Sequence, residues 1–208
     1  MNKLVTSLIG VSAFISASVL AGNTTTLNDT FSIPSKGTLH LDVPVGQVIL
    51  ETHDANNIQV RVEVRNESDI WFGDDDEKVN LENAEIKHRN SNNNLYLEIN
   101  NEKLIQKWTV YMPENTNLEL EVGVGEVNLK GQLADIDVEV GVGEVDVELE
   151  HNNYTSIELE SGVGDVDLDG FKGATQERGM VSGGVEWHGS GDYKIDIEVG
   201  VGEVDVER

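Results

Sequence analysis

The stretch Leu118-Glu-Leu-Glu-Val-Gly-Val-Gly-Glu-Val-Asn-Leu129 alternates apolar residues with carboxylates on both sides of a Gly-Val-Gly unit. Alternation with a period of two is typical of a strand that buries one face. The alternation slips by one residue at Gly125, which would turn the second half of a straight strand inside out. Glycine reaches backbone angles that are closed to other residues, so a corner at this unit absorbs the slip. The pattern therefore predicts a strand, a glycine corner and a second strand.

The same pattern recurs through the second half of the chain. Its copies begin at Leu118, Ile136, Ile157, Gln176 and Ile195, which lie 18, 21, 19 and 19 residues apart. A period of about 19 residues is close to the range that marks solenoids. We therefore predict an all-β, solenoid-like fold (a parallel β-helix or roll) in which stacked copies share one core. The alternative is an antiparallel β-sandwich, in which each glycine corner closes a hairpin.

If the copies stack in parallel register, equivalent residues form columns. Leu120 and Val138 then lie side by side in the core, while the outward columns consist of carboxylates. Like charges about 4.8 Å apart repel by roughly 0.9 kcal/mol for each pair in water. Salt, raised carboxylate pKa values or weakly bound Ca²⁺ relieve this repulsion, so we expect salt or calcium to stabilise the fold. The candidate metal ligands follow the corners: Glu126, Glu144, Asp146, Asp165, Asp167, Glu203 and Asp205.

Two segments depart from the repeat and supply candidate partner-binding residues. In the fourth copy, Arg178 occupies an apolar column and Trp187 takes a position that Leu or Val holds elsewhere. We interpret this copy as a distorted coil near the end of the stack, or as a groove whose Arg178 and Trp187 contact a ligand. Trp71 and Phe72 precede the acidic run 74–77. That segment is either a solvated loop or a protruding partner site with an aromatic anchor.

Residues 1–21 have the features of a secretory signal peptide. Lys3 gives a positive start, an apolar stretch follows, and Val19-Leu20-Ala21 is a small-residue cleavage site. We expect export to the periplasm, the cell surface or the exterior, with no membrane span after cleavage. The polar residues 23–28 that follow are expected to fray.

The mature chain divides into an irregular β portion, 22–113, and a regular β-repeat portion, 114–208. Pro44-Val45-Gly46 lies 79 residues before Gly123-Val-Gly125, which is close to four periods. This spacing indicates that a divergent copy of the repeat also lies in the irregular portion.

The order of these segments resembles the exported bacterial putative-adhesin family of the DUF4097 type. The resemblance rests on the strand 108–113, which ends in Tyr-Met-Pro, and on the Gly-Val-Gly-Asp/Glu-Val units at Gly123, Gly141 and Gly162. It implies a β-solenoid-like domain and a surface or envelope role, with no catalytic residues attached. This chain is richer in acids than that pattern.

Charge narrows the class of partner. Asp and Glu number 39 against 14 Lys and Arg, which gives a net charge of −25. Such a surface repels nucleic acid and favours basic or cationic partners. His188, Ser190 and Asp192 are close in sequence, but a nucleophile triad needs geometry supplied by separate elements.

We therefore predict a non-enzymatic envelope binding or structural module without a cofactor, whose partner lies in the envelope or on a surface. Two alternatives remain. One is a hydrolase of envelope glycans or peptides, because carboxylate pairs abound. The other is a self-assembling surface scaffold, because the last copy ends at Arg208 and leaves an uncapped strand edge.

Overall fold

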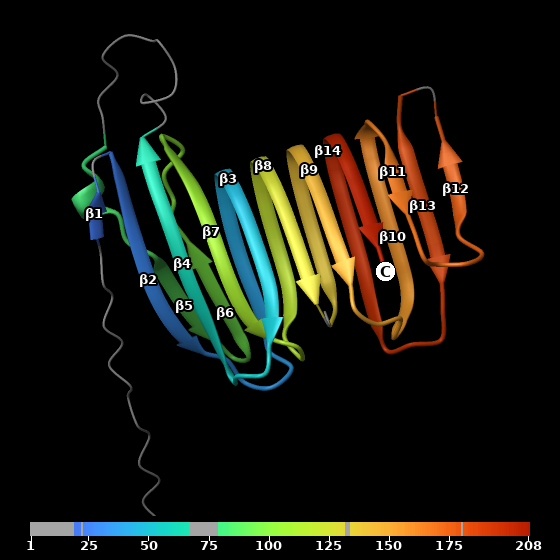
Figure 1. Ribbon diagram of the computed structural model, residues 1–208, viewed down its shortest axis with the longest axis horizontal. Coiled ribbons are helices and arrows are strands. Elements are labelled where there is room, and N and C mark those ends of the chain that lie inside the picture. Colours follow the sequence, from blue (N-terminus) through green and yellow to red (C-terminus); the bar gives the residue numbers. More distant parts are fainter. Residues whose placement is uncertain (1–18, 22, 67–78, 132–133, 180) are drawn as a thin grey trace, which may run out of the picture.

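The computed structural model describes residues 19–21, 23–66, 79–131, 134–179 and 181–208 (Figure 1). These residues form one 14-stranded sheet and a short 3-10 helix, so the predicted all-β class is confirmed. The elements are β1 (Val19–Ala21), β2 (Thr24–Ser32), β3 (Thr38–His53), β4 (Asn57–Asn66), η2 (Leu81–Asn83), β5 (Lys87–Ser91), β6 (Asn94–Glu98), β7 (Leu104–Pro113), β8 (Asn117–Gly131), β9 (Ile136–Leu149), β10 (Tyr154–Val163), β11 (Val166–Leu168), β12 (Thr175–Arg178), β13 (Gly183–His188) and β14 (Tyr193–Glu207).

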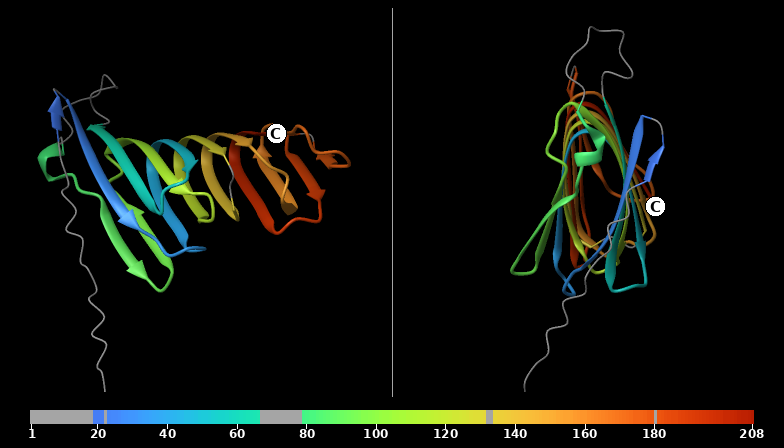
Figure 2. Two further views of the ribbon diagram at one scale, coloured as in Figure 1. Left: turned by 60° about the horizontal axis from the view of Figure 1, so that its bottom comes forward. Right: turned by 90° about the vertical axis from the view of Figure 1, so that its left-hand side faces the viewer.

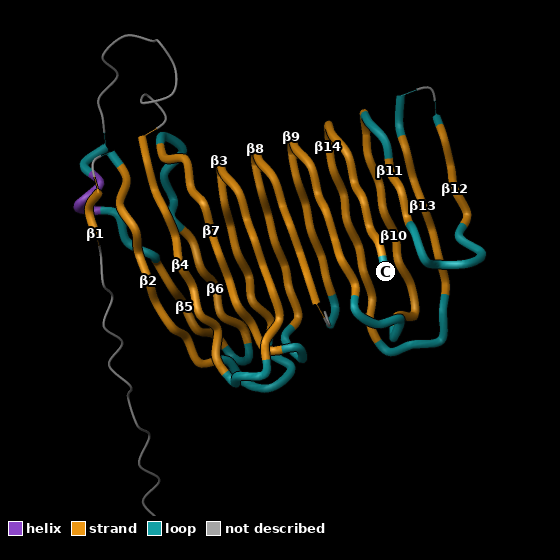
Figure 3. The backbone as a smooth tube through the Cα atoms, in the orientation of Figure 1, coloured by secondary structure: helices purple, strands orange, loops and turns teal. Residues whose placement is uncertain are grey.

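The sheet is antiparallel at its two ends and parallel in the middle. Its main order is β1-β2-β4-β7-β3-β8-β9-β14-β10-β13-β12. Strands β3, β8, β9, β14 and β10 run parallel with equivalent residues side by side. The order in space is not the order in sequence, because β14 lies between β9 and β10 (Figure 3).

The glycine corners divide each long parallel strand between two facing layers. Before its corner, β3 pairs with β6, whereas after the corner it pairs with β7. In β8, Leu120 is buried before the corner, and Val127 and Leu129 are buried after it, although the alternation has slipped by one residue. The end-on view in Figure 2 shows the two layers. The bend therefore absorbs the slip as predicted.

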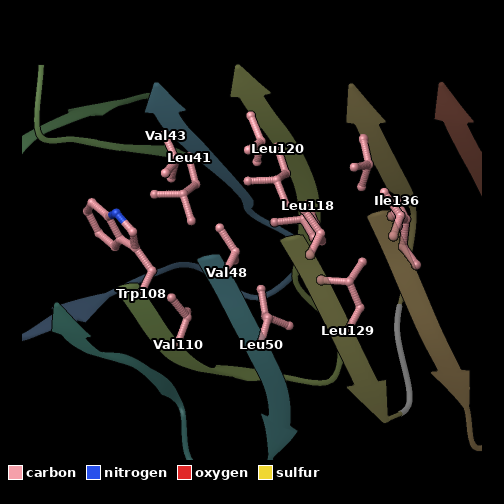
Figure 4. Close-up of a cluster of buried hydrophobic side chains, with 14 of the residues drawn as sticks. Leu41, Val43, Val48, Leu50, Trp108, Val110, Leu118, Leu120, Leu129 and Ile136 are labelled. Atoms are coloured by element: carbon pink, nitrogen blue, oxygen red, sulfur yellow. The ribbon is translucent and has the colours of Figure 1, made fainter. Parts of the chain in front are cut away.

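We call the layer with β5, β6 and the strand halves before the corners the first layer. The second layer contains β2, β4, β7, β11 and the halves after the corners. Apolar side chains from both layers fill the space between them (Figure 4). Leu120 and Val138 are paired in register and are 3% and 1% exposed, so their predicted place in a shared core is confirmed.

The corner glycines lie next to one another across the parallel strands. Gly46, Gly125, Gly143, Gly202 and Gly164 follow in that order from β3 to the end of β10. A Cβ atom added at Gly143 would lie 1.7 Å from the carbonyl oxygen of Gly125, and the other four positions meet a neighbouring carbonyl oxygen in the same way. The backbones approach so closely that only glycine fits.

The divergent early copy predicted around Pro44 is confirmed. In β3, Gly46 pairs with Gly125 of β8, which keeps the offset of 79 residues. The expectation that residues 23–28 fray was wrong. They belong largely to β2, which pairs along its whole length with β4, because Thr25 and Leu27 turn inward and are buried.

The fourth copy does not continue the parallel stack. Strands β12 and β13 form an antiparallel hairpin, and β13 pairs antiparallel with β10. Gln176 was expected to occupy a core column, but it is exposed in β12. The physical reason is that this copy lacks the apolar residues that a coil must bury on both sides of its corner.

The expectation that the last copy forms an open edge was also wrong. Strand β14 pairs with β9 on one side and with β10 and β11 on the other. The edge at this end of the sheet is formed by β12 instead.

Substitution Gly143→Ala tests the close approach at the corners. We expect a loss of more than about 3 kcal/mol in the free energy of unfolding, because the new methyl group overlaps a backbone oxygen that cannot move away. Gly184→Ala is the matched control, since its added Cβ meets only the Leu159 carbonyl oxygen at 3.8 Å. Urea denaturation of the two variants measures the difference, and equal stabilities would contradict the steric argument.

Candidate functional site

Carboxylates form continuous columns on the outer faces of both layers, at right angles to the strands. On the first layer, Glu121, Glu139, Glu198 and Glu160 lie side by side on β8, β9, β14 and β10, and all four are exposed. Neighbouring strands are about 4.8 Å apart, so each carboxylate has like charges on both sides. The outer face of the first layer is therefore a concentrated anionic surface.

Burial and neighbouring charges raise the pKa values of three carboxyl groups on the outer faces. Partial burial raises the pKa of Asp196, and the charges of Asp137 and Glu158 add to the effect. On the second layer, the charge of Asp205 is the main cause of a raised pKa at Glu203. The pKa of Asp205 is itself raised, first by burial and then by neighbouring carboxylates. The repulsion expected from the sequence therefore acts on individual side chains.

The seven predicted metal ligands fall into two columns on the second layer. Glu126, Glu144, Glu203 and Asp165 follow the corners, and Asp146, Asp205 and Asp167 lie two residues further along. Glu126 accepts a hydrogen bond of 2.9 Å from Gln47 Nε2. Among the described residues, no three acidic or histidine side chains form a group that could hold a metal ion. Calcium binding by these residues thus remains a prediction.

A groove of about 560 Å³ crosses the first layer where β5 and β6 join β3. At one end, the Tyr96 ring stacks on His40 with their centroids 4.1 Å apart, and the Arg89 guanidinium lies 3.7 Å from the Tyr96 centroid. His40 Nδ1 is 2.6 Å from a Glu119 carboxylate oxygen. Towards the other end, the lining is acidic and includes Glu139. The groove therefore joins a basic, aromatic end to the carboxylate columns.

Asp42 is the carboxyl group with an altered acidity in this groove. Burial raises its pKa, and the charges of Glu121 and Glu98 raise it further. Sequence reasoning missed this site because it depends on how the β5–β6 hairpin pairs with the first half of β3. Period-two alternation in Leu95 to Ile99 signals a strand but does not identify its partner.

Of the four predicted partner residues, Trp187 is the one whose side chain the structure describes. Trp71 and Phe72 lie outside the described residues. Arg178 lies in β12, and its side chain is likewise outside the description. Trp187 is half-buried on β13, where its ring meets Phe171 edge-on at 5.0 Å and its indole N–H donates to the Lys172 carbonyl oxygen at 3.2 Å. The contacts of Trp187 hold the connection before β12 in place.

Two of the three residues set aside as a triad, His188 and Asp192, have other partners. His188 Nε2 lies 2.9 Å from a Glu186 carboxylate oxygen, and Asp192 accepts a hydrogen bond from Asn153 Nδ2.

Among the described residues, no helix has the length and apolar character needed to cross a membrane.

The carboxylate columns predict that salt stabilises the protein. Raising NaCl from about 20 mM to about 500 mM should raise Tm by several degrees. The Debye length falls from roughly 20 Å to about 4 Å, so the repulsion between carboxylates of the same column is largely screened. Millimolar CaCl₂ should add a further increase over NaCl of equal ionic strength if cations settle between the columns. Differential scanning calorimetry measures both effects, and a flat Tm in either series would contradict the corresponding cause.

The raised pKa values predict that mild acid also stabilises the protein. Asp196, Glu203 and Asp205 bind protons more readily in the folded chain than at the ordinary values of 3.8 for Asp and 4.5 for Glu. Stability from this source is present below those ordinary values and is lost as the pH rises through the folded pKa values. In low salt, Tm should therefore rise as the pH falls from 7.5 towards those ordinary values. In high salt the increase should shrink, and a fall in Tm over this range would contradict the assignment.

Comparison with solved structures finds proteins that resemble this chain in fold. A "putative cell adhesion protein" from Clostridium sporogenes superposes with a TM-score of 0.50 at 17% identity, covering 86% of this chain and 98% of that chain. A "putative adhesin" from Parabacteroides merdae gives 0.30 at 13% identity, covering 70% and 56%. Another from Bacteroides fragilis gives 0.27 at 12% identity, covering 87% and 96%. The first of these supports the fold alone.

Sequence comparison identifies the family. No curated protein matches the chain. The DUF4097 type, to which the motifs show a resemblance, is not the family whose model matches. Residues 23–169, which include the groove and the first three copies of the repeat, match the model of the N-terminal domain of toast_rack, DUF2154. The chain therefore belongs to the toast_rack N-terminal domain family.

Proposed function

We propose that this protein is a non-enzymatic, exported, solenoid-like module that binds a basic partner in the bacterial envelope or on a surface. The proposal includes removal of residues 1–21 as a signal peptide. The name of the Clostridium sporogenes structure, a "putative cell adhesion protein", agrees with this role. The charge of −25 opposes binding to nucleic acid and to anionic lipid, because like charges repel, which supports a basic partner.

The observation that carries the proposal is the array of carboxylates across the parallel strands of the first layer. Glu121, Glu139, Glu198 and Glu160 form one column, and Glu119, Asp137, Asp196 and Glu158 form a second. An array of fixed like charges creates a strong potential over a broad surface and speeds the approach of a cationic partner. Because the charges repeat, binding energy is spread over many side chains and is not concentrated in one.

The fold accounts for these carboxylates without catalysis. They occupy every second position of strands whose other positions fill the core, which is the pattern of a solvent-facing strand surface. Catalysis needs a few groups aimed at one reacting atom and set apart in acidity from their neighbours. The columns instead repeat acids at equivalent positions across the parallel strands.

One observation favours a second function, hydrolysis of envelope glycans. Asp42 lies in the groove with a raised pKa beside Glu121 and Glu98, as a general acid beside a second carboxylate would. The Tyr96 ring, however, lies between His40 and Arg89, and both contacts reduce the ring surface on which a sugar could stack.

Binding of an oligolysine peptide distinguishes a distributed surface from a single site. The variant Glu139→Gln should weaken binding by less than about threefold, because it removes one charge from a column. Replacing Glu121, Glu139, Glu198 and Glu160 together by Gln should weaken it by more than about tenfold and reduce its salt dependence. Glu102→Gln is the control, since Glu102 is an exposed carboxylate in the turn before β7, away from the columns. Titration calorimetry at two salt concentrations measures the affinities.

Two outcomes would overturn the proposal. One is unchanged affinity in the fourfold variant. The other is release of soluble sugars from envelope glycan by the native protein together with loss of that activity in Asp42→Asn, which would establish the hydrolase.

A further inference from the structure

Exposed apolar side chains gather on one edge of the molecule. The large apolar residues exposed among the described part of the chain are Tyr111, Val124, Val142, Val163, Val181 and Val201. Four of these six are the central residues of Gly-Val-Gly corners and are 47–49% exposed. The pairing of the parallel strands places them side by side in the order Val124, Val142, Val201, Val163.

We call these four residues the valine ridge. It follows the upper edge of the sheet in Figure 1, where the strands turn from one layer to the other. One end is continued by Val45, which pairs with Val124 and is half-buried. At the other end, Gly164 N–H donates a hydrogen bond to the Val181 carbonyl oxygen, so the hairpin tip adjoins the ridge.

The fold does not require valine on this ridge. The glycines on either side are fixed by backbone contact, but the residue between them faces solvent and fills no core space. Threonine would serve a strand equally well there, because it is also β-branched. Single exposed apolar residues are normal on protein surfaces, whereas an aligned row of them marks an interaction surface.

Carboxylates border the ridge on both sides. Glu121 and Glu126 are the nearest outward side chains that flank Val124 along β8, since Val122 is buried and both glycines lack side chains. Equivalent carboxylates flank the other ridge valines on their own strands. The two acidic borders are five residues apart and so at most roughly 17 Å from each other. The surface is an apolar strip between two anionic borders.

The spacing along the ridge selects the kind of segment that fits. Adjacent valines are about 4.8 Å apart, so the four span roughly 14 Å. Apolar residues at i, i+3 or i+4 on a helix advance about 5.3 Å along its axis, whereas alternate residues of an extended strand advance about 6.7 Å. Over three intervals a helix drifts by roughly 2 Å from the ridge and a strand by roughly 6 Å. With a diameter of about 10–12 Å, a helix also brings long basic side chains within reach of both borders.

We propose that the valine ridge is the docking site for a basic amphipathic helix of a partner protein. The helix lies along the ridge, across the strands, with its apolar stripe on Val124, Val142, Val201 and Val163. Its Lys and Arg residues meet the carboxylates on either side. This inference rests on the proposed binding function and names the structure and chemistry of the partner.

Charge argues against the other occupants. A second copy of this chain would bring its own acidic borders against those of the first, and like charges opposed across an interface cost affinity. An anionic lipid surface is repelled for the same reason. A basic helix is the occupant for which both the apolar strip and its borders are complementary.

A pair of synthetic peptides tests the inference on the native protein. The first is a helix of about 15 residues with Leu at i, i+3, i+4, i+7 and i+11 and Lys at most other positions. The second has the same composition with its leucines spread around the helix. Fluorescence anisotropy should give the first peptide at least about tenfold higher affinity, because only it can place its leucines on the ridge.

Variants of the protein supply the matched control. Replacing the four ridge valines by Thr keeps the strand shape and should remove most of the preference for the first peptide. Tyr111→Thr should keep that preference, since Tyr111 is exposed on β7, away from the corners. Circular dichroism and urea denaturation check that each variant folds, and the peptide comparison on the native protein needs no substitution.

The outcomes separate this inference from the proposed function. Equal, salt-dependent binding of both peptides would overturn the ridge and leave the acidic binding surface standing. Failure of both peptides to bind would overturn both. A native protein that sediments as a dimer, and as a monomer when the four valines are Thr, would assign the ridge to a second copy and overturn the helix.

Discussion

The structure depends on the contact of backbone with backbone at the glycine corners. At each corner, the strands come so close that a carbonyl oxygen fills the space where a side chain would begin. This contact fixes which residues pair across β3, β8, β9, β14 and β10, because a shift by one residue would place a valine where only glycine fits. The core, the carboxylate columns and the valine ridge all follow from that register.

Repetition made the middle of the fold predictable. The alternation of apolar residues and carboxylates around Leu120 and Val138 indicates which strand face is buried. The period of the repeat indicates that these two residues are neighbours. The position of β14 was not predictable in this way, because every regular copy offers similar surfaces to its neighbours. One signal was available: residues 136–148 and 195–207 differ only at Val138 and Ile197, and these two nearly identical copies are adjacent.

The candidate sites also differ in how far the sequence alone could predict them. The carboxylate columns could be read from single copies, since each acid's direction follows from its place in a strand. The groove could not, because it needs the pairing of Arg89 and Tyr96 on one hairpin with His40 on β3. The antiparallel hairpin β12–β13 was missed for a related reason. The fourth copy keeps the spacing of the repeat but has lost the apolar residues that a coil must bury.

The place of β14 constrains how the protein can be assembled. In a solenoid whose coils stack in chain order, each new coil can add to the one before it. Here β10 can reach the rest of the sheet only through β14, a strand that leaves the ribosome, and any export channel, after it. The hairpin β12–β13 must likewise wait. Completion of the molecule is therefore delayed until the last strand of this sequence inserts, and the partly built edge of β9 stays open to other chains during that interval.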